Sequence, residues 1–358
     1  MIGRRVRAND GLRPAGGARA VVVGLSLVSV VCAGVGLTGC GGSGAAANAI
    51  TLYNGQHEQT TDALVAAFEK QTGITVNVRN DDEDTLADQI VAEGARSPAD
   101  VIYTENSPAL EYLQGQGLLA PVDPSTLAKT PSPYNSPEGK WVGVSARVSV
   151  LIYNPSLIAE SALPTSVLEL ADPRYMGKLA VAPGETDFQP IVTSVLRTYG
   201  QAAALRWLQG VKANAENHVY PDNETIADEV NRGTVAFGIV NQYYWYRLSG
   251  EIGVANVHSK ITYLAPHDPG YVLDVSGAGV LESSAHQAAA QEFLTFLVSA
   301  QGQEIIARSE SFEYPIASGV TTAQPETPFA DLAPTAISIA ELGDGAAAIA
   351  LLKQSGLL

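Results

Sequence analysis

The chain has 358 residues, and its 21 Lys and Arg against 37 Asp and Glu give a formal net charge of −16 at pH 7. The first 39 residues hold five Arg and one Asp, a net +4, so the remaining chain carries −20. A domain this acidic has no basic surface for nucleic acid or anionic lipid, and although the charge also favours solubility, it suits a cationic ligand.

The N-terminus has the pattern of an export signal. An Arg-rich start precedes an apolar run from Ala20 to Leu37, which is the order of regions in a signal peptide. The run ends in Leu37-Thr38-Gly39-Cys40, which resembles the lipobox of bacterial lipoproteins, where the peptide is cut before the cysteine and the thiol is acylated. We predict a signal peptide over residues 1–39, then a lipidated Cys40 and a flexible tether to residue 49. The alternative is a membrane-spanning anchor, because the run approaches the roughly 20 apolar residues that cross a bilayer.

The cysteine count restricts the possible metal sites. Cys32 and Cys40 are the two cysteines of the chain, and the signal peptide and the lipid account for both. The mature domain therefore has no disulfide, thiolate metal site or cysteine nucleophile. Its roughly 320 residues exceed the size at which one hydrophobic core stops growing, so we expect two lobes.

The first folded segment predicts alternating strands and helices. Leu64, Val65 and Phe68 recur at helical spacing, and Gly73 follows them as a C-cap. The expected order is strand Ile50–Tyr53, helix Thr61–Gln71, strand Ile74–Val78, helix Thr85–Ala95 and strand Asp100–Tyr103. This alternation predicts a mostly parallel α/β sheet with its ligand site at the carboxyl ends of the strands.

Two long extended segments, Arg147–Asn154 and Leu273–Leu281, divide the rest of the chain. A second α/β set lies between them. It comprises helices near Gln189–Tyr199, Ala202–Lys212 and Thr225–Arg232 and strands near Leu179–Ala182 and Val235–Val240, and helices His286–Ser299, Gln301–Arg308 and Gly345–Gln354 follow the second segment. We expect the two segments to be hinge crossovers between two lobes with a ligand cleft between them. Lobe 1 is predicted to hold residues 50–149 and 275–322, and lobe 2 residues 150–274 and 323–358.

His57 and Glu105 are the first pair of candidate metal ligands. Each falls just past the end of an expected strand of lobe 1. Because such strand ends meet at one rim of a sheet, we expect the two side chains on the same rim. Taken alone, a His or Glu in such a loop is more often a helix cap or a solvated side chain, so the shared placement favours a metal site only modestly.

Tyr243 and Tyr244 are the second pair. They follow the expected strand Val235–Val240 and Asn241, a good N-cap, so we expect them to open a helix. In a first helical turn they lie about 100° apart and can converge on one point, whereas on a strand they would face opposite sides. By themselves the two tyrosines are better explained as packing aromatics than as metal ligands.

The summed charge of these four side chains favours ferric iron. Two phenolates and one carboxylate cancel the charge of Fe³⁺, and a neutral imidazole completes four ligands. Two coordination positions stay open for water or a small anion. Because the phenol pKa is near 10, binding must displace two protons, and a divalent ion gains less Coulomb energy for the same deprotonation.

Five segments carry a family resemblance: Tyr53–His57, Val101–Glu105, Asn241–Trp245, Asp274–Val280 and Glu313–Pro315. Together they make the mature chain resemble the bacterial ferric-binding proteins, periplasmic members of the transferrin-like, type II solute-binding superfamily. The resemblance implies a two-lobe α/β binding-protein fold and no catalytic residues. It also implies that His57, Glu105, Tyr243 and Tyr244 together form one iron site.

The resemblance further implies a synergistic anion, such as carbonate or phosphate, in the open coordination positions. Asn223 and Asn241 match positions that hydrogen-bond this anion, and Asn106 stands where many members carry Gln. We add Arg147 as a fourth candidate for anion binding.

The chain departs from the family at Pro183–Phe188, where relatives carry a Ser/Gly-rich turn that cradles phosphate at a helix N-terminus. Glu185 and Asp187 in this loop repel phosphate if they point inward. We therefore expect carbonate, water or a protein carboxylate in place of phosphate.

The sequence thus predicts a monomeric lipoprotein on the outer face of the cytoplasmic membrane, held there only by its lipid. We expect it to capture ferric iron and pass it to the permease and ATPase of an ABC importer. One alternative keeps the fold but binds a polyamine, thiamine or a phosphonate, none of which needs a convergent His, Glu and Tyr set. A more distant alternative is a mononuclear iron enzyme, which would require two His and a carboxylate.

Overall fold

The computed structural model describes residues 49–322 and 327–358. The predicted signal peptide and Cys40 lie outside the described residues. Within the described ranges, every helix is too short or too polar to cross a membrane.

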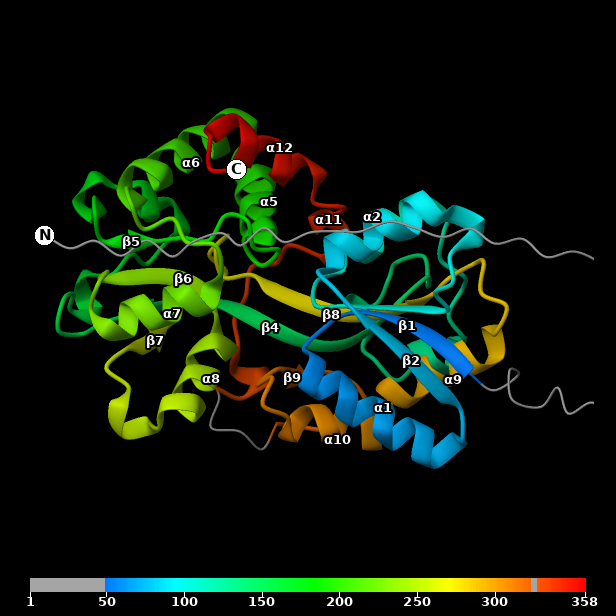
Figure 1. The fold of residues 1–358 in the computed structure, drawn as a ribbon. Coiled ribbons are helices and arrows are strands. Elements are labelled where there is room, and N and C mark those ends of the chain that lie inside the picture. Colours follow the sequence, from blue (N-terminus) through cyan, green and yellow to red (C-terminus); the bar gives the residue numbers. More distant parts are fainter. Residues whose placement is uncertain (1–48, 323–326) are drawn as a thin grey trace, which may run out of the picture. The chain divides into compact units, whose positions relative to one another are not determined.

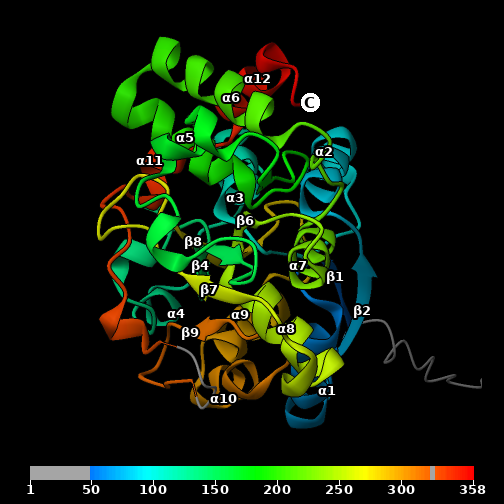
Figure 2. The same cartoon turned by 90° about the vertical axis from the view of Figure 1, so that its left-hand side faces the viewer.

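The strands form a mixed sheet in the order β2-β1-β3-β8-β4-β6-β5, and β7 and β9 also pair with β4 (Figure 1). Figure 2 shows β2 at the edge of the structure in that view. The strands of the described residues are β1 (Ala49–Gly55), β2 (Thr75–Asn80), β3 (Val101–Thr104), β4 (Val142–Tyr153), β5 (Leu179–Ala180), β6 (Phe237–Asn241), β7 (Lys260–Thr262), β8 (Leu273–Val280) and β9 (Tyr314–Pro315).

The α/β class is confirmed, but the expectation of a mostly parallel sheet is wrong. β1 pairs in parallel with β2 and β3, as the alternating pattern predicted. β8 pairs antiparallel with β3 and β4, and β4 pairs antiparallel with β6. The reason is that β4 leads out to the intervening α/β set and β8 returns from it, so the two long strands run in opposite directions side by side.

The long strand β4 changes partners along its length. Its residues from Val142 to Val148 pair with β8, and those from Ser149 to Tyr153 pair with β6. One strand therefore belongs to both halves of the sheet, with the change at Val148 and Ser149. The exact division of the chain into two lobes stays a prediction.

Helices cover both faces of the sheet. They are α1 (Glu58–Thr72), α2 (Glu83–Glu93), α3 (Ser107–Gly115), α4 (Pro124–Leu127), α5 (Phe188–Tyr199), α6 (Gln201–Ala215), α7 (Asn223–Arg232), α8 (Gln242–Ile252), α9 (Gln287–Leu297), α10 (Ala300–Arg308), α11 (Ile339–Leu342) and α12 (Ala346–Ser355). In Figure 1, α2 lies on one side of β1, and α1, α9 and α10 lie on the other. The C-terminal helix α12 packs on α5 and α6.

The apolar periodicity of α1 shows why these elements form. Leu64, Val65 and Phe68 are buried on one face, and Gly73 ends the helix in the left-handed conformation with φ 72°. The Phe68 ring meets Phe293 of α9 edge-on, with centroids 5.0 Å apart. Full burial of such a side chain contributes about 1.5–3 kcal/mol. The loops after β1 and β3 are thus anchored in a well-packed core.

Candidate metal centre

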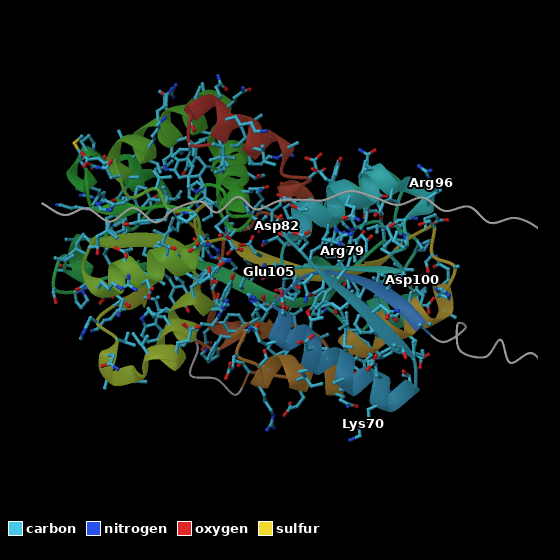
Figure 3. All side chains as sticks on the ribbon, in the orientation of Figure 1. Lys70, Arg79, Asp82, Arg96, Asp100 and Glu105 are labelled. Carbon is cyan, nitrogen blue, oxygen red and sulfur yellow. The ribbon has the colours of Figure 1, made fainter. Side chains whose placement is uncertain are left out.

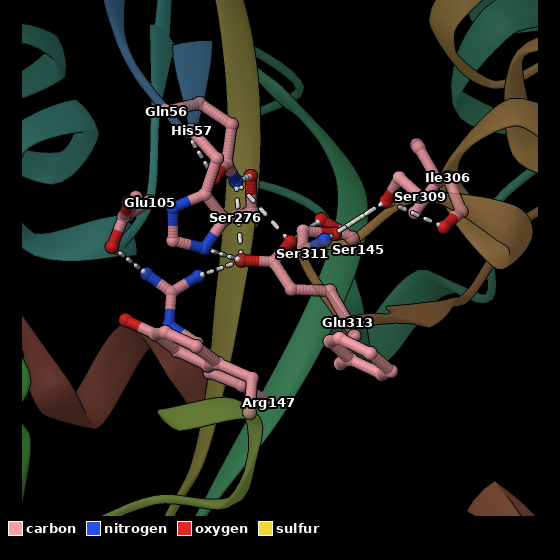
Figure 4. Close-up of polar contacts among 12 residues, drawn as sticks. Gln56, His57, Glu105, Ser145, Arg147, Ser276, Ile306, Ser309, Ser311 and Glu313 are labelled. Atoms are coloured by element: carbon pink, nitrogen blue, oxygen red, sulfur yellow. Dashed lines mark hydrogen bonds and ion pairs between the residues drawn. The ribbon is translucent and has the colours of Figure 1, made fainter. Parts of the chain in front are cut away.

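His57 and Glu105 come together at the rim of the sheet. β1 and β3 are parallel neighbours, so the loops that follow them lie side by side. His57 follows β1 as the N-cap residue of α1, and Glu105 follows β3. Nδ1 of His57 lies 3.0 Å from Oε1 of Glu105 (Figure 4). Glu105 can also be located on the whole chain in Figure 3.

Tyr243 and Tyr244 reach the same place from the other half of the sheet. Both lie in the first turn of α8, directly after β6, and both are buried. Their ring centroids are 4.1 Å apart with an interplanar angle of 32°. The Tyr243 ring also meets the His57 ring edge-on, with centroids 4.9 Å apart. The four residues of the predicted ligand set are therefore neighbours.

Asp187 is the point on which the surrounding donors converge. The hydroxyls of Tyr243 and Tyr244 donate to its Oδ2 over 3.3 and 3.1 Å. The side-chain amide of Asn223 donates to Oδ2 over 3.2 Å, and that of Asn106 to Oδ1 over 3.3 Å. Nε of Arg147 lies 3.5 Å from Oδ1. Asp187 therefore points inward, and it is 4% exposed.

Four helices begin beside this site, and their N-cap side chains do not cap them. His57, Asn106, Asp187 and Asn241 are the N-cap residues of α1, α3, α5 and α8, and none accepts a capping hydrogen bond. Asp and Asn normally stabilise a helix by about 1 kcal/mol when they cap it. Three of them, His57, Asn106 and Asp187, instead make polar contacts with other side chains of the site. The positive ends of the helices favour negative charge there.

Arg147 supplies a buried positive charge. Its Nη2 lies 3.3 Å from Oε2 of Glu105, and its Nη1 donates to Oε1 of Glu313 over 3.0 Å. Burial opposes the guanidinium charge, but Glu313, Glu105 and Asp187 outweigh it and raise the pKa of Arg147. Burial likewise opposes the Glu105 carboxylate, yet the neighbouring His57 and Arg147 hold the pKa of Glu105 well below its usual value.

The surroundings of the two phenols favour their protonated forms. Burial, followed by the charges of Asp187 and Glu105, raises the pKa of Tyr243 and of Tyr244 well above the ordinary value near 10. Burial lowers the pKa of His57, but Glu105 and then Glu313 raise it more, so the net direction is upward. A metal that takes these ligands must therefore displace protons.

A cavity of about 220 Å³ adjoins the site. It is lined by Gly55, His57, Asp82, Glu83, Glu105, Glu185, Thr186, Glu224, Tyr244 and Arg247. Burial and then the charge of Asp187 raise the pKa of Glu185 to about 8. In the described part of the chain, no three His, Cys, Asp or Glu side chains are grouped to hold a metal by themselves.

The predicted anion-binding residues separate into two groups. Asn106, Asn223 and Arg147 all contact Asp187. Asn241 does not. It is the N-cap residue of α8, as expected, but its side chain accepts no capping hydrogen bond. Asn241 is the last residue of β6, paired with Ser149 of β4, so the pleat of the strand fixes its side-chain direction. Burial raises the pKa of the nearby Asp274 to about 8, and a hydrogen bond from the Asn241 side chain opposes this rise.

Two buried acids that the sequence did not single out complete the surroundings. Glu83 accepts hydrogen bonds from the backbone N–H and the side-chain amide of Asn106, over 2.8 and 3.0 Å. Glu313 lies within 3.6 Å of Nε2 of His57. The sequence offered only weak signals: Glu83 opens a helix, and Glu313 belongs to a segment that carries the family resemblance. Both side chains reach the site only through contacts that form when the chain folds, and the local sequence does not reveal these contacts.

The chain belongs to the family of bacterial extracellular solute-binding proteins, whose model matches residues 54–304. This is a family of binding proteins and not of enzymes.

The similarity to ferric-binding members is confirmed. The Fe(3+)-binding periplasmic protein of Serratia marcescens is 38% identical over 309 residues, which are 86% of this chain and 90% of that protein. The crystal structure of iron-bound HitA from Pseudomonas aeruginosa matches with a TM-score of 0.82 and 41% identity, covering 86% of this chain and 99% of that one. The Trichodesmium protein in complex with iron and citrate ligands matches with a TM-score of 0.76 and 30% identity, covering 87% and 100%. The predicted two-lobe binding-protein fold is thereby confirmed.

Proposed function

We propose that this chain captures ferric iron outside the cytoplasm and delivers it to an ABC importer. The observation that carries the proposal is the meeting of two buried phenols with the His57–Glu105 pair around one inward carboxylate. The relatives support the choice of cargo, since one is a Fe(3+)-binding periplasmic protein and two solved structures hold iron. Iron is here the transported substrate.

The proposed ligands are His57, Glu105, Tyr243 and Tyr244. After loss of the phenol protons, the two tyrosinates and Glu105 supply three negative charges to Fe³⁺. The four side chains come from segments on both sides of β4 in the sequence. An open form that binds iron with one pair and then closes over it with the other would gain affinity only in the closed state. Opening by the importer, together with protonation or reduction of iron, would then release it.

Asp187 is proposed as a built-in fifth ligand in place of a synergistic anion. Three of the four residues expected to bind an anion already contact its carboxylate. With Asp187, four negative charges balance Fe³⁺ and the Arg147 guanidinium. Phosphate beside Asp187 would add repulsion in a buried site, where charges interact strongly. The adjoining cavity leaves the sixth position to water or a small anion such as carbonate.

We also propose how the protein is held at the membrane and what receives its iron. A lipid on Cys40 would hold the chain at the outer face of the cytoplasmic membrane as a monomer, and a permease with its ATPase would receive the iron. A different cargo on the same fold remains the main competitor. A polyamine would need stacking and acidic groups, and the two tyrosines here face a carboxylate and His57 instead.

Iron binding with a visible colour tests the proposal. The purified full chain is mixed with excess ferric citrate and separated from unbound iron by gel filtration. We expect one iron per chain and a visible absorption band from phenolate-to-iron charge transfer, without consumption of any substrate. Zn²⁺ serves as the control and should give no band. A colourless, iron-free protein peak would refute the proposal, and a coloured protein that consumes oxygen would favour an enzyme.

Iron affinity is expected to fall steeply as the pH is lowered. Because burial and nearby carboxylates raise the pKa values of Tyr243 and Tyr244, both phenols must lose a proton to bind iron at neutral pH. Two protons released per iron reduce the apparent affinity about 100-fold for each unit of decreasing pH. Below the raised pKa of His57 a third proton steepens the dependence. Competition with a ferric chelator of known pH behaviour measures the slope, and a slope near zero between pH 6 and 8 would show that the phenols are not ligands.

A further inference from the structure

Glu313 is a buried acid outside the proposed ligand set. It precedes β9, in which Tyr314 pairs with Ala146 of β4, so its position beside Ser145 and Arg147 follows from that pairing. The residue is 2% exposed. An acid buried to this extent must be hydrogen-bonded or paired, or its burial is strongly unfavourable.

Donors from two segments, β4 and the loop after β1, surround the Glu313 carboxylate. Nη1 of Arg147 donates to Oε1 over 3.0 Å. Nε2 of Gln56 lies 3.3 and 3.2 Å from the two carboxylate oxygens, and the Ser145 hydroxyl donates to Oε2. Figure 4 shows these contacts meeting at one carboxylate. Glu313 is therefore held in place independently of His57.

Two routes connect Glu313 to His57. The first is the side chain of Gln56, whose Nε2 reaches Glu313 and whose Oε1 accepts the backbone N–H of His57 over 2.7 Å. The second is direct, because Nε2 of the His57 ring lies 3.6 Å from Oε1 of Glu313. Glu313 thus acts on both the backbone and the ring of this residue.

The two carboxylates beside His57 differ in whether they can still accept the imidazole N–H once iron is bound. A neutral imidazole has one lone pair for a metal and one N–H that needs an acceptor. Glu105 faces Nδ1, but it is itself a proposed iron ligand. Glu313 faces Nε2 and is fixed by other donors. Metal-bound histidines commonly give their second N–H to such an outer carboxylate, and loss of that partner costs roughly 10–100-fold in affinity.

We propose that Glu313 is a positioning residue of the ferric site, which orients His57 through its ring and through Gln56 and holds Arg147 between Glu105 and Asp187. This inference rests on the proposed function of the chain. Glu313 does not touch the iron. Its effect on affinity therefore passes through His57 and Arg147.

A double-mutant cycle tests the inference on the full chain. Glu313→Gln is expected to weaken ferric affinity by about 10–100-fold, measured by competition with a chelator, and to shift the charge-transfer band. In a His57→Ala background the same substitution should have a smaller effect, because the ring is gone and only the contact with Arg147 remains. Glu313→Asp keeps the charge and should recover part of the lost affinity. Glu111→Gln removes a partly buried acid that accepts from Trp141 outside the site and should leave iron binding unchanged.

Three results would overturn the inference. They are wild-type affinity in Glu313→Gln, an equal loss in the presence and absence of the His57 ring, or no recovery in Glu313→Asp. The unfolding temperature of each variant, compared with Glu111→Gln, separates a lost contact from a lost fold. If the wild-type chain itself shows no ferric band, the proposed function fails, which is a different outcome from failure of Glu313 to position His57.

Discussion

Replacement of Tyr243 or Tyr244 by Phe is expected to remove most of the charge-transfer band and to weaken ferric affinity more than any other single change. Each substitution deletes one phenolate ligand. Loss of an outer partner of a metal ligand already lowers metal affinity roughly 10–100-fold, so loss of a direct ligand should lower it more than ~100-fold. The ring packing should persist, because the contact between the two rings and the contact with His57 do not require the hydroxyl. Visible spectroscopy with chelator competition measures both effects.

A buried tyrosine elsewhere provides the matched control. Tyr175 is 2% exposed, and its hydroxyl donates to the backbone carbonyl of Ala162 over 2.9 Å, outside the site. Tyr175→Phe removes a comparable hydroxyl and should keep the full band. If Tyr243→Phe and Tyr244→Phe also keep it, the tyrosines serve only packing and the account of the site is wrong.

Replacement of Asp187 by Ala is expected to make iron binding depend on an added anion. In the wild-type chain the carboxylate fills the place of the anion, so affinity should not change when carbonate and phosphate are removed from the buffer. In Asp187→Ala the affinity should drop by ~100-fold without added anion, as for loss of a direct ligand. Millimolar acetate or carbonate should restore much of the lost affinity, because the deleted carboxylate leaves a space among its former donors.

Glu185→Gln is the control for Asp187. Glu185 lines the same cavity, but its pKa of about 8 leaves it mostly uncharged at neutral pH, so an amide there should change little. If the wild-type chain already requires an added anion, or if Asp187→Ala binds iron as tightly as wild type without one, Asp187 is not a ligand.

The sequence predicted those parts of the site whose positions follow from the pattern of residues close in sequence. The strands before His57 and Glu105 are short apolar runs, and two parallel neighbours necessarily end at the same rim. Tyr243 was correctly assigned to the first turn of a helix, because the strand before it stops at Asn241. These placements depend only on residues close in sequence.

The parts that were not predicted depend on contacts between distant segments. Whether Asp187 points inward is decided by Asn106, Asn223 and Tyr244, which come from three other helices. Glu313 reaches His57 across 256 positions of sequence, through a two-residue strand too short to give a periodic signal. The missing capping hydrogen bond of Asn241 has the same origin, since pairing with β4 fixes the direction of its side chain although it stands at the helix N-terminus.

A crystal structure of the iron-loaded chain, with anomalous diffraction measured at the iron absorption edge, tests the central claim most directly. The account predicts one strong anomalous peak within bonding distance of His57, Glu105, Tyr243 and Tyr244, with an oxygen of Asp187 in the fifth position. A peak away from the two tyrosine hydroxyls, or phosphate bound to iron where Asp187 now lies, would contradict it.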